Sequence, residues 1–331
     1  MKNVENRNRK FLGSFIDTSS LGAIGILLVL MTLLAIFVPG HNFIRPDNIK
    51  NLLSYGSEFA IIVLGAGLLM IAGEFDLSVG SVLAFCSFVF VKLFSLGINL
   101  FLVVIITLIC GAAIGMINGL ITTKGRILSF VATLGTMMFW RGITVMASGG
   151  AMMPSDTSEF KFFTYVFIGE IGKFFPSQAV WLILAAIILG FILHRHKFGN
   201  WVFSTGDNER AARSMAINTD RVKIICFVIV GLLVAFAAII QTVQLAAFSS
   251  RSGTGLELEV VAAAVVGGTS LRGGKGNMLG ILIGAFIIVI IKNAFVLARL
   301  PYEWTYIAFA LIIMLSVLLD LLIENSRKKV V

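Results

Sequence analysis

The sequence is poor in the charged residues that cover the surface of a soluble protein. Only 13% of its 331 residues are charged, whereas 58% are hydrophobic. Soluble domains carry roughly 25% charged residues. This composition excludes an ordinary soluble domain and predicts an all-α polytopic membrane protein.

Groups that carry catalysis or bind metals are also scarce. The three histidines stand at positions 41, 194 and 196, and the three cysteines lie singly within apolar runs. We therefore expect no catalytic set, no metal site and no directly bound cofactor. The G-G-K at residues 273–275 is not a phosphate-binding loop, because Thr269 stands where glycine is required and Gly276 follows the lysine. The chain thus has no ATP site of its own.

Apolar runs recur along the chain, and a hydrocarbon core about 30 Å thick needs roughly 20 residues of helix. We expect about ten transmembrane helices in a domain at residues 21–323, with cytoplasmic tails at residues 1–20 and 324–331. Ten crossings place both termini and the dense basic clusters on one side, as the positive-inside rule requires. Cytoplasmic loops therefore explain the net charge of +9, and nucleic acid is not an expected partner.

Two apolar segments are too short for a simple crossing. Phe59–Ala72 precedes G-E-F-D-L-S-V-G-S, and Val260–Gly267 runs into G-G-T-S-L-R-G-G-K-G-N. Such paired interruptions predict broken or re-entrant helices and suggest an internal duplication.

Three glycines lie four residues apart within one apolar run, at Gly111, Gly115 and Gly119. This spacing predicts a ridge of small residues that allows close contact with another helix.

Two carboxylates in the first interruption need a physical explanation, because an ionised side chain within a bilayer costs roughly 2.5–3.5 kcal/mol on insertion scales. Asp76 is expected to cap the following helix by accepting hydrogen bonds from its first amides. Glu74 has no such role, so a partner or a water-filled path stays open for it.

A charge-rich stretch interrupts the apolar sequence at residues 204–223. Asn208 is expected to cap a short helix with Ala211, Ala212, Met215 and Ala216 on one side. A helix this short is not stable alone. Taken by itself, the stretch fits either a solvated loop or a docking helix for a soluble partner.

Five motifs, in order from about Asn48 to Leu322, point to one family. They are G-E-F-D-L-S-V-G-S, T-L-G-T-M-M-F-W-R-G, G-D-N-E-R-A-A-R-S-M-A-I-N, G-T-G-L-E-L-E-V-V-A-A-A-V-V-G-G-T-S-L-R-G-G-K-G and L-L-D-L-L. Together they resemble the permease subunit of bacterial monosaccharide ABC importers of the ribose type. The resemblance implies a transport subunit of the bacterial cytoplasmic membrane that is not itself an enzyme.

The resemblance also implies partners and a cargo. The partners are a second permease copy or paralogue, cytosolic ATP-binding cassette subunits that hydrolyse ATP with Mg²⁺, an extracytoplasmic sugar-binding protein and membrane lipid. The cargo is a ribose-like pentose or a hexose. A nucleoside, an autoinducer or a branched-chain amino acid is the alternative cargo, and a proton-coupled secondary transporter is the alternative class.

By the same resemblance, residues 206–218 form the coupling helix that sits in a cleft of the ATPase. We therefore prefer the docking helix to the solvated loop as the interpretation of this stretch. The expected coupling residues are Gly206, Asn208, Arg210, Ala211, Ala212, Arg213, Ile217 and Arg221. The two alanines would allow close approach, and the arginines would pair with the ATPase. The candidate residues of the translocation path are Glu74, Asp76, Ser78, Glu257, Gly267, Gly268, Thr269 and Ser270.

The chain departs from the family pattern near these positions. Glu74 and Phe75 stand where Gly-Ile is more frequent, Glu259 replaces an aspartate, and residues 127–129 lack a common Pro-Pro. Ala216 replaces a glycine, which restricts the loop after the coupling helix. The changes at 74 and 259 bear on the identity of the sugar.

Overall fold

The structure is a computed structural model that describes residues 18–172, 174–301, 303–312, 314 and 318. The expected C-terminal tail, most of L-L-D-L-L and the end of the last expected crossing lie outside the described residues. So does most of the expected N-terminal tail. Its last three residues are described and belong to the first helix, which begins at Thr18.

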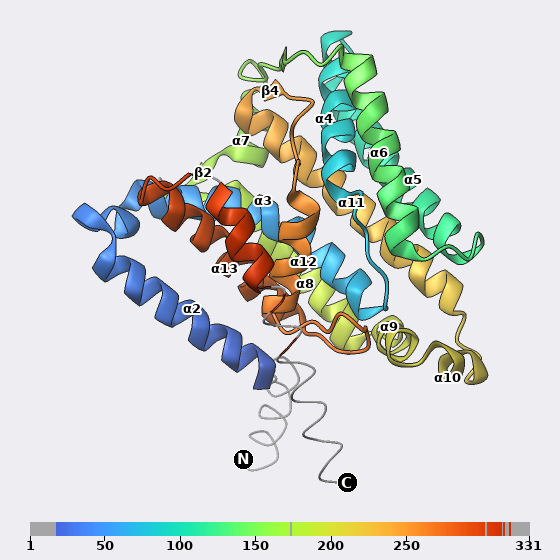
Figure 1. Ribbon diagram of the computed structural model, residues 1–331. Coiled ribbons are helices and arrows are strands. Elements are labelled where there is room, and N and C mark those ends of the chain that lie inside the picture. Colours follow the sequence, from blue (N-terminus) through green and yellow to red (C-terminus); the bar gives the residue numbers. More distant parts are fainter. Residues whose placement is uncertain (1–17, 173, 302, 313, 315–317, 319–331) are drawn as a thin grey trace, which may run out of the picture.

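Helices make up nearly all of the described chain (Figure 1). In chain order they are α2 (Thr18–Phe37), the 3₁₀ helix η1 (Pro39–Ile44), α3 (Pro46–Ile71), α4 (Val79–Ser95), α5 (Leu100–Thr123), α6 (Ser129–Ser148), α7 (Lys161–Ile168), α8 (Ser177–Arg195), α9 (Lys197–Asp207), α10 (Glu209–Ser214), α11 (Thr219–Leu245), α12 (Leu256–Val266) and α13 (Met278–Leu297). Two short antiparallel ladders join loops. They pair β1 (Met153–Pro154) with β4 (Ala247–Phe248), and β2 (Glu170–Ile171) with β3 (Phe175–Pro176).

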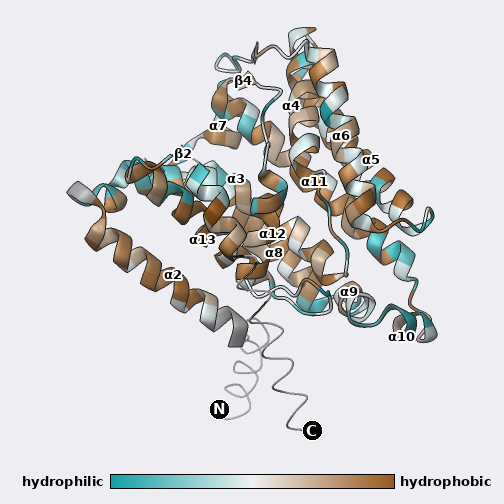
Figure 2. Cartoon of the chain, viewed as in Figure 1, coloured by the Kyte–Doolittle hydropathy of each residue, from teal (hydrophilic) through white to brown (hydrophobic). Residues whose placement is uncertain are grey.

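Six of the described helices are long and apolar enough to cross a membrane, namely α3, α5, α6, α8, α11 and α13. Shorter apolar helices occur at Gly22–Phe37, Val79–Ser95 and Glu303–Ile312. Figure 2 shows hydrophobic residues along these helices and hydrophilic residues gathered around α10. The prediction of a polytopic α-helical membrane protein is confirmed.

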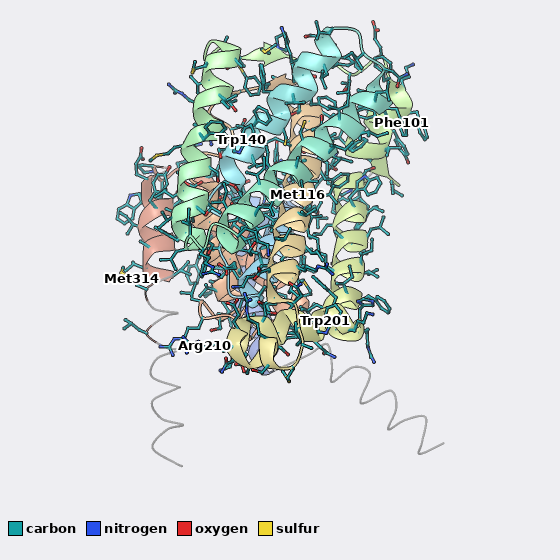
Figure 3. All side chains as sticks on the ribbon, turned by 90° about the vertical axis from the view of Figure 1, so that its right-hand side faces the viewer. Phe101, Met116, Trp140, Trp201, Arg210 and Met314 are labelled. Atoms are coloured by element: carbon teal, nitrogen blue, oxygen red, sulfur yellow. The ribbon has the colours of Figure 1, made fainter. Side chains whose placement is uncertain are left out.

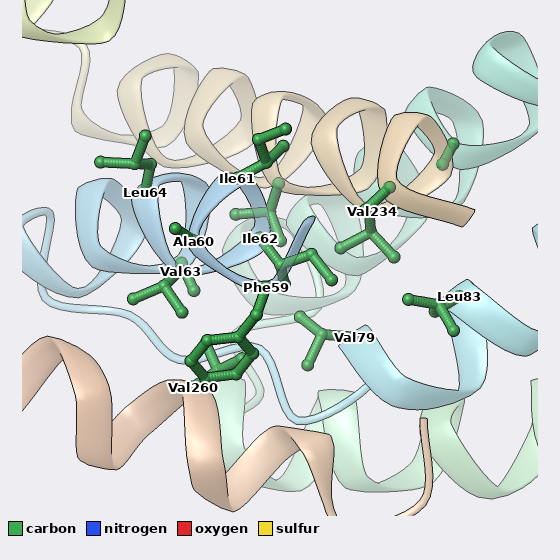
Figure 4. Packing of buried hydrophobic residues seen from close by; sticks show 14 of the residues in the cluster. Phe59, Ala60, Ile61, Ile62, Val63, Leu64, Val79, Leu83, Val234 and Val260 are labelled. Carbon is green, nitrogen blue, oxygen red and sulfur yellow. The ribbon is translucent and has the colours of Figure 1, made fainter. Parts of the chain in front are cut away.

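The centre of the protein is α3, which packs against α8, α11, α12 and α13. Its residues 59–71 are all buried, and Figure 4 shows Phe59–Leu64 between Val79, Val234 and Val260. The expectation of a short helix confined to Phe59–Ala72 is wrong, because α3 runs unbroken from Pro46 to Ile71. The polar first half continues the helix because its side chains find partners. Asn48, for example, donates to Asn293 of α13 at 3.1 Å.

The second expected short segment is confirmed. Helix α12 has 11 residues and ends before Gly267. At 1.5 Å per residue it is about 16 Å long, half of what a crossing requires. A loop at residues 267–277 connects it to α13.

The predicted glycine ridge is also confirmed, and its partner is α11. A β-carbon on Gly111 would lie 2.4 Å from the carbonyl oxygen of Gly231, and one on Gly115 would lie 2.2 Å from that of Phe227. Gly119 faces Ile224 with a corresponding distance of 3.0 Å. The backbones of α5 and α11 therefore touch along three turns, which only glycine permits.

Candidate coupling site

The segment between α3 and α4, residues 72–78, is the α3–α4 break. Gly73 has a φ of +87°, a left-handed conformation that ends α3. Its amide donates to Met70 and that of Glu74 to Leu69, the bonding pattern of a glycine-terminated helix. The sequence therefore stops α3 with one glycine, and Glu74 follows directly at its end.

The rest of the α3–α4 break is held by hydroxyl groups of α6. The amide of Phe75 donates to Ser129 Oγ at 3.1 Å, and the amide of Leu77 donates to Thr133 Oγ1 at 3.0 Å. These bonds satisfy backbone groups that have no helical partner. The break is thus a fixed part of the fold.

Asp76 stabilises the start of α4 in a modified form of the predicted cap. Its Oδ1 accepts from the amide and the hydroxyl of Ser78 at 2.8 and 2.6 Å, while Ser78 itself occupies the cap position. Asn118 of α5 donates to Ser78 Oγ at 2.8 Å. All three side chains are buried within the protein.

The short helix α10 begins and ends as a separate unit. The prediction that Asn208 caps it is confirmed, because Asn208 Oδ1 accepts from the amide of Ala211 at 3.1 Å. At the other end Ala216 has a φ of +60°, and Ile217 donates back to the carbonyl of Ala212. Glycine is the usual residue at this position. Ala216 therefore carries a cost of roughly 1–2 kcal/mol for the left-handed conformation.

Six ionised side chains connect α10 to the ends of the membrane helices. This charge cluster consists of Glu74, Lys124, Glu209, Arg213, Asp220 and Lys223. Arg213 contacts Glu209 at 2.7 Å and Asp220 at 2.6 Å, and Lys124 closes the far side by contacting Asp220 at 2.8 Å. Three cations face three carboxylates, so the cluster balances its own charge.

Lys223, in the first turns of α11, joins the α3–α4 break to α10. Its Nζ contacts Glu74 at 2.6 Å and Glu209 at 2.8 Å, and the side chains of Lys223 and Glu74 are each only 11% exposed. Glu74 therefore has an internal partner. The sequence shows both residues but does not show that they meet.

Glu209 keeps its charge within this cluster. Partial burial raises its pKa, but hydrogen bonds from Lys223 and Arg213 lower it by more, so the pKa lies below its ordinary value. The stabilisation that follows is present above the ordinary carboxylate pKa and is lost only as the pH falls through the lowered value. The cluster is therefore intact at neutral pH. A polar cavity of about 450 Å³ lies beside it, with Arg126 in its lining.

Glycines from three segments meet next to the charge cluster, and we call this contact the glycine junction (Gly73, Gly206, Gly273 and Gly274). Gly274 donates its amide to the carbonyl of Ile71 at 2.8 Å. A β-carbon on Gly206 would lie 1.9 Å from that same carbonyl, and one on Gly273 would lie 2.7 Å from Gly73 Cα. Both interruptions predicted from the sequence thus contact each other and the residues that precede α10.

Replacing Gly206 by alanine is expected to lower the melting temperature of the purified protein, because the new methyl group would overlap backbone atoms that cannot move aside. Overpacking of this kind costs about 1–3 kcal/mol. Gly135→Ala in α6 is the matched control, since a β-carbon there meets nothing within 4 Å. If Gly206→Ala and Gly135→Ala had the same melting temperature, the close packing of the glycine junction would be contradicted.

Comparison with known proteins identifies the chain. The family described as the permease component of branched-chain amino acid transport systems matches residues 48–318. The chain belongs to this permease family. The ribose import permease RbsC of Escherichia coli K12 is 36% identical over 297 residues, which cover 89% of this chain and 91% of the relative. RbsC of Bacillus subtilis is 35% identical, with 89% and 90% covered, and the autoinducer 2 import permease LsrC of Yersinia enterocolitica is 31% identical, with 91% and 81% covered. The resemblance found in the motifs is confirmed.

Most of α10 is exposed, and Ala212 is the buried one of its six residues. Ala211 is exposed and Met215 is 62% exposed, whereas Ala212 is completely buried against the permease itself. The expectation that both alanines lie on one side is therefore wrong, because successive residues of an α-helix point about 100° apart, so Ala212 can be buried while Ala211 is exposed. Figure 3 shows Arg210 at the same end as Trp201 and far from Phe101.

The remaining expected coupling residues divide into two groups. Arg210 and Arg221 are exposed and form no ion pair with another residue that the structure describes. Arg213 is occupied by Glu209 and Asp220 within the permease, and Ile217 packs partly against the core. Arg210 and Arg221 are therefore the cations available to a partner.

Five of the eight candidate path residues lie at the two ends of α12, and the other three lie in the α3–α4 break. Gly267, Gly268, Thr269 and Ser270 follow its last turn, on the side of the glycine junction. Glu257 is in its first turn, and its Oε2 would lie 3.0 Å from a β-carbon on Gly80 of α4. Near it, Arg141 of α6 donates to the carbonyls of Ser250 and Ser252 at 2.8 Å. The structure therefore separates Glu257 from the four candidates that follow α12 by the length of this helix and places it beside the start of α4, next to Ser78.

Three polar residues inside the helix bundle were not predicted as functional from the sequence. They are Glu58, Gln241 and Lys292. Gln241 donates to Glu58 at 2.6 Å, and Lys292 contacts Glu259 at 2.8 Å. A lysine within the apolar run of residues 278–297 is rare enough to serve as a signal of function.

Proposed function

We propose that this permease carries a monosaccharide, a ribose-like pentose or a hexose, across the bacterial cytoplasmic membrane as a subunit of an ATP-binding cassette importer. The observation that carries the proposal is the 36% identity to a ribose import permease over 89% of the chain. Autoinducer 2 is the second candidate cargo, because relatives named for its import are 31% identical.

We further propose a topology of ten crossings with both termini in the cytoplasm. The six long helices and the three shorter apolar helices supply nine segments, and the half-length α12 together with the connecting chain before and after it supplies the tenth. In this topology α10 and the loop at Lys124 and Arg126 face the cytoplasm, in agreement with the positive-inside rule.

Coupling to a cytosolic ATPase is proposed for residues 204–223, with Arg210, Ala211 and Arg221 in direct contact with that partner. A movement of residues 204–223 would be transmitted to the α3–α4 break through Lys223. It would be transmitted to the loop after α12 through the glycine junction. The remaining partners are a second permease subunit and an extracytoplasmic sugar-binding protein. Glu74, Asp76 and Ser78 are assigned to the connection between the coupling helix and the translocation path.

Uptake of radiolabelled D-ribose tests the cargo. The permease is expressed, together with an ATPase and a binding protein from the same organism, in Escherichia coli cells that lack their own ribose permease. We expect ribose to accumulate, an ATPase-inactivating mutation to abolish this, and unlabelled leucine not to compete. Accumulation of leucine in place of ribose would overturn the proposal, and uptake that stops with a proton uncoupler but not with the ATPase mutation would indicate a secondary transporter.

A further inference from the structure

An apolar groove follows the surface of α8, away from the charge cluster. Its volume is about 540 Å³, and its walls come mainly from α3, α8 and α13. The residues that α8 contributes extend from Ala179 to Phe191, about 18 Å at 1.5 Å per residue. Ile183, Ile187 and Phe191 are 48%, 63% and 60% exposed, so the groove is open along its side. Because α8 is a candidate membrane span, this side opens to the bilayer.

The accessible wall of the groove consists of hydrocarbon. Apart from Ser57 and Gly190, every lining residue is aliphatic, aromatic or methionine. The hydroxyl oxygen of Ser57 is buried and so is not part of the accessible wall. A polar solute that entered would lose its hydrogen bonds to water without replacement. The groove therefore suits a hydrocarbon chain that lies along α8.

Two exposed cations stand where the apolar wall stops. At this end α8 contacts the start of α13, because His194 Nε2 accepts a hydrogen bond from the amide of the lining residue Met278 at 3.5 Å. Arg195 follows directly as the last residue of α8, and Lys197 begins α9. Both residues are exposed.

The charges around this end of the groove are mainly positive. No carboxylate occurs in α8, in α13 or in the loop that precedes α13, and this loop adds Arg272 and Lys275. The carboxylate of α9 is Asp207, which lies beside Gly274 of the same loop and at the opposite end of α9 from Lys197. An anionic group is therefore attracted to the end of the groove.

Trp201 indicates the depth at which these cations lie in the membrane. It is 38% exposed on α9, and Lys197 Nζ lies 5.6 Å from the centroid of its ring. Tryptophan is enriched at the interface between membrane and water. Figure 3 shows Trp201 at the end of the molecule that carries Arg210. Arg195 and Lys197 thus lie at the level of lipid headgroups, with the groove extending from them into the hydrocarbon.

We propose that the groove holds an acyl chain of an anionic phospholipid of the cytoplasmic leaflet, whose phosphate contacts Arg195 and Lys197. The inference rests on the proposed topology, which places α9 on the cytoplasmic side, and it does not depend on the cargo. A zwitterionic phospholipid offers the same chain but no net charge, so the site distinguishes the two lipids by their headgroups.

Lipid titration of the full-length permease tests the headgroup contact. The protein is purified in detergent, freed of native lipid and titrated with palmitoyl-oleoyl phosphatidylglycerol or phosphatidylcholine, and native mass spectrometry counts the bound lipid. We expect phosphatidylglycerol to bind more tightly, and Lys197→Gln to weaken its binding roughly fivefold, the contribution of one basic residue near a membrane surface. Lys92→Gln, which removes an exposed cation at the end of α4, is the matched control and should bind normally.

Ile183→Trp tests the groove itself, because it adds a ring to the wall. Leu184→Trp is the matched control, since Leu184 is the neighbouring residue, is 44% exposed and does not line the groove. We expect Ile183→Trp to weaken the binding of phosphatidylglycerol about tenfold, since a filled groove tolerates little added volume. The control is expected to bind as the unchanged permease does.

Three results would overturn the lipid site. They are equal affinity for the two lipids, equal binding of phosphatidylglycerol by Ile183→Trp and Leu184→Trp, and dissociation of a permease dimer by Ile183→Trp with lipid binding unchanged, which would assign the groove to a second copy. A permease that binds phosphatidylglycerol as expected but imports no ribose would overturn the proposed cargo and leave the lipid site standing. Labelling of Lys197→Cys from outside intact cells would overturn the proposed topology and the assignment to the cytoplasmic leaflet together.

Discussion

Replacing Ala211 by tryptophan will remove the ATPase subunits from the purified transporter while the permease itself stays folded in the membrane. Ala211 lies on the exposed face of α10, between Asn208 and Met215, so a large ring at this position projects into the cleft proposed to hold the helix. Close packing tolerates little added volume, and the expected loss of binding is at least tenfold. The measurement is the amount of ATPase recovered with a tagged permease.

Two further variants make this result interpretable. Ala147→Trp places the same ring on an exposed position at the end of α6 farthest from α10, and it should leave the complex intact. Ala212→Trp fills a fully buried position and should unfold α10 from the permease, so it does not distinguish docking from stability. Full recovery of ATPase with Ala211→Trp would show that α10 is not the docking helix.

Replacing Lys223 by methionine is expected to destabilise the permease more than any other single change in the charge cluster. Lys223 is the cation between Glu74 and Glu209, and removing one member of a buried ion pair costs about 3–5 kcal/mol because a charge is left unpaired. With both side chains 11% exposed, we expect the lower end of this range, about 3 kcal/mol. Thermal melting of the purified permease measures the effect.

The double variant Lys223→Met, Glu74→Gln should recover most of the lost stability, because it removes the unpaired charge as well. Lys50→Met is the matched control. Lys50 pairs with Glu170 at the surface, where both side chains are a third or more exposed, and such a pair contributes about 0–1 kcal/mol. If Lys223→Met lowered the melting temperature no more than Lys50→Met does, the ion pairs of Lys223 would not contribute to the stability of the permease.

The features predicted correctly from the sequence depend on neighbours in the chain. The cap at Asn208 and the glycine ridge of α5 are encoded within a few turns, so residue type and spacing are sufficient. The shortness of α12 follows in the same way from the glycines that end it.

The features that the sequence did not reveal depend on distant residues. Glu74 forms an ion pair with Lys223, which is far along the chain, and Glu58 accepts a hydrogen bond from the equally distant Gln241. The length of α3 was missed because its polar half is stabilised by partners on other helices. The inward turn of Ala212 was missed because α10 is too short for a periodic pattern to indicate which side is buried.

The contact between α5 and α11 restricts how the helices of this permease can move during transport. A rotation of α5 that carried Ala112 or Ala113 into the place of Gly111 would drive a β-carbon against the carbonyl group of Gly231 in α11. The two helices must therefore travel as one rigid body through the transport cycle.

The half-length α12 is held to α13 in the same way, since a β-carbon on Gly284 would lie 2.1 Å from the carbonyl oxygen of Ala263 and one on Gly267 would lie 2.4 Å from that of Gly280. Opening and closing of the passage therefore requires these two helix pairs to move relative to each other.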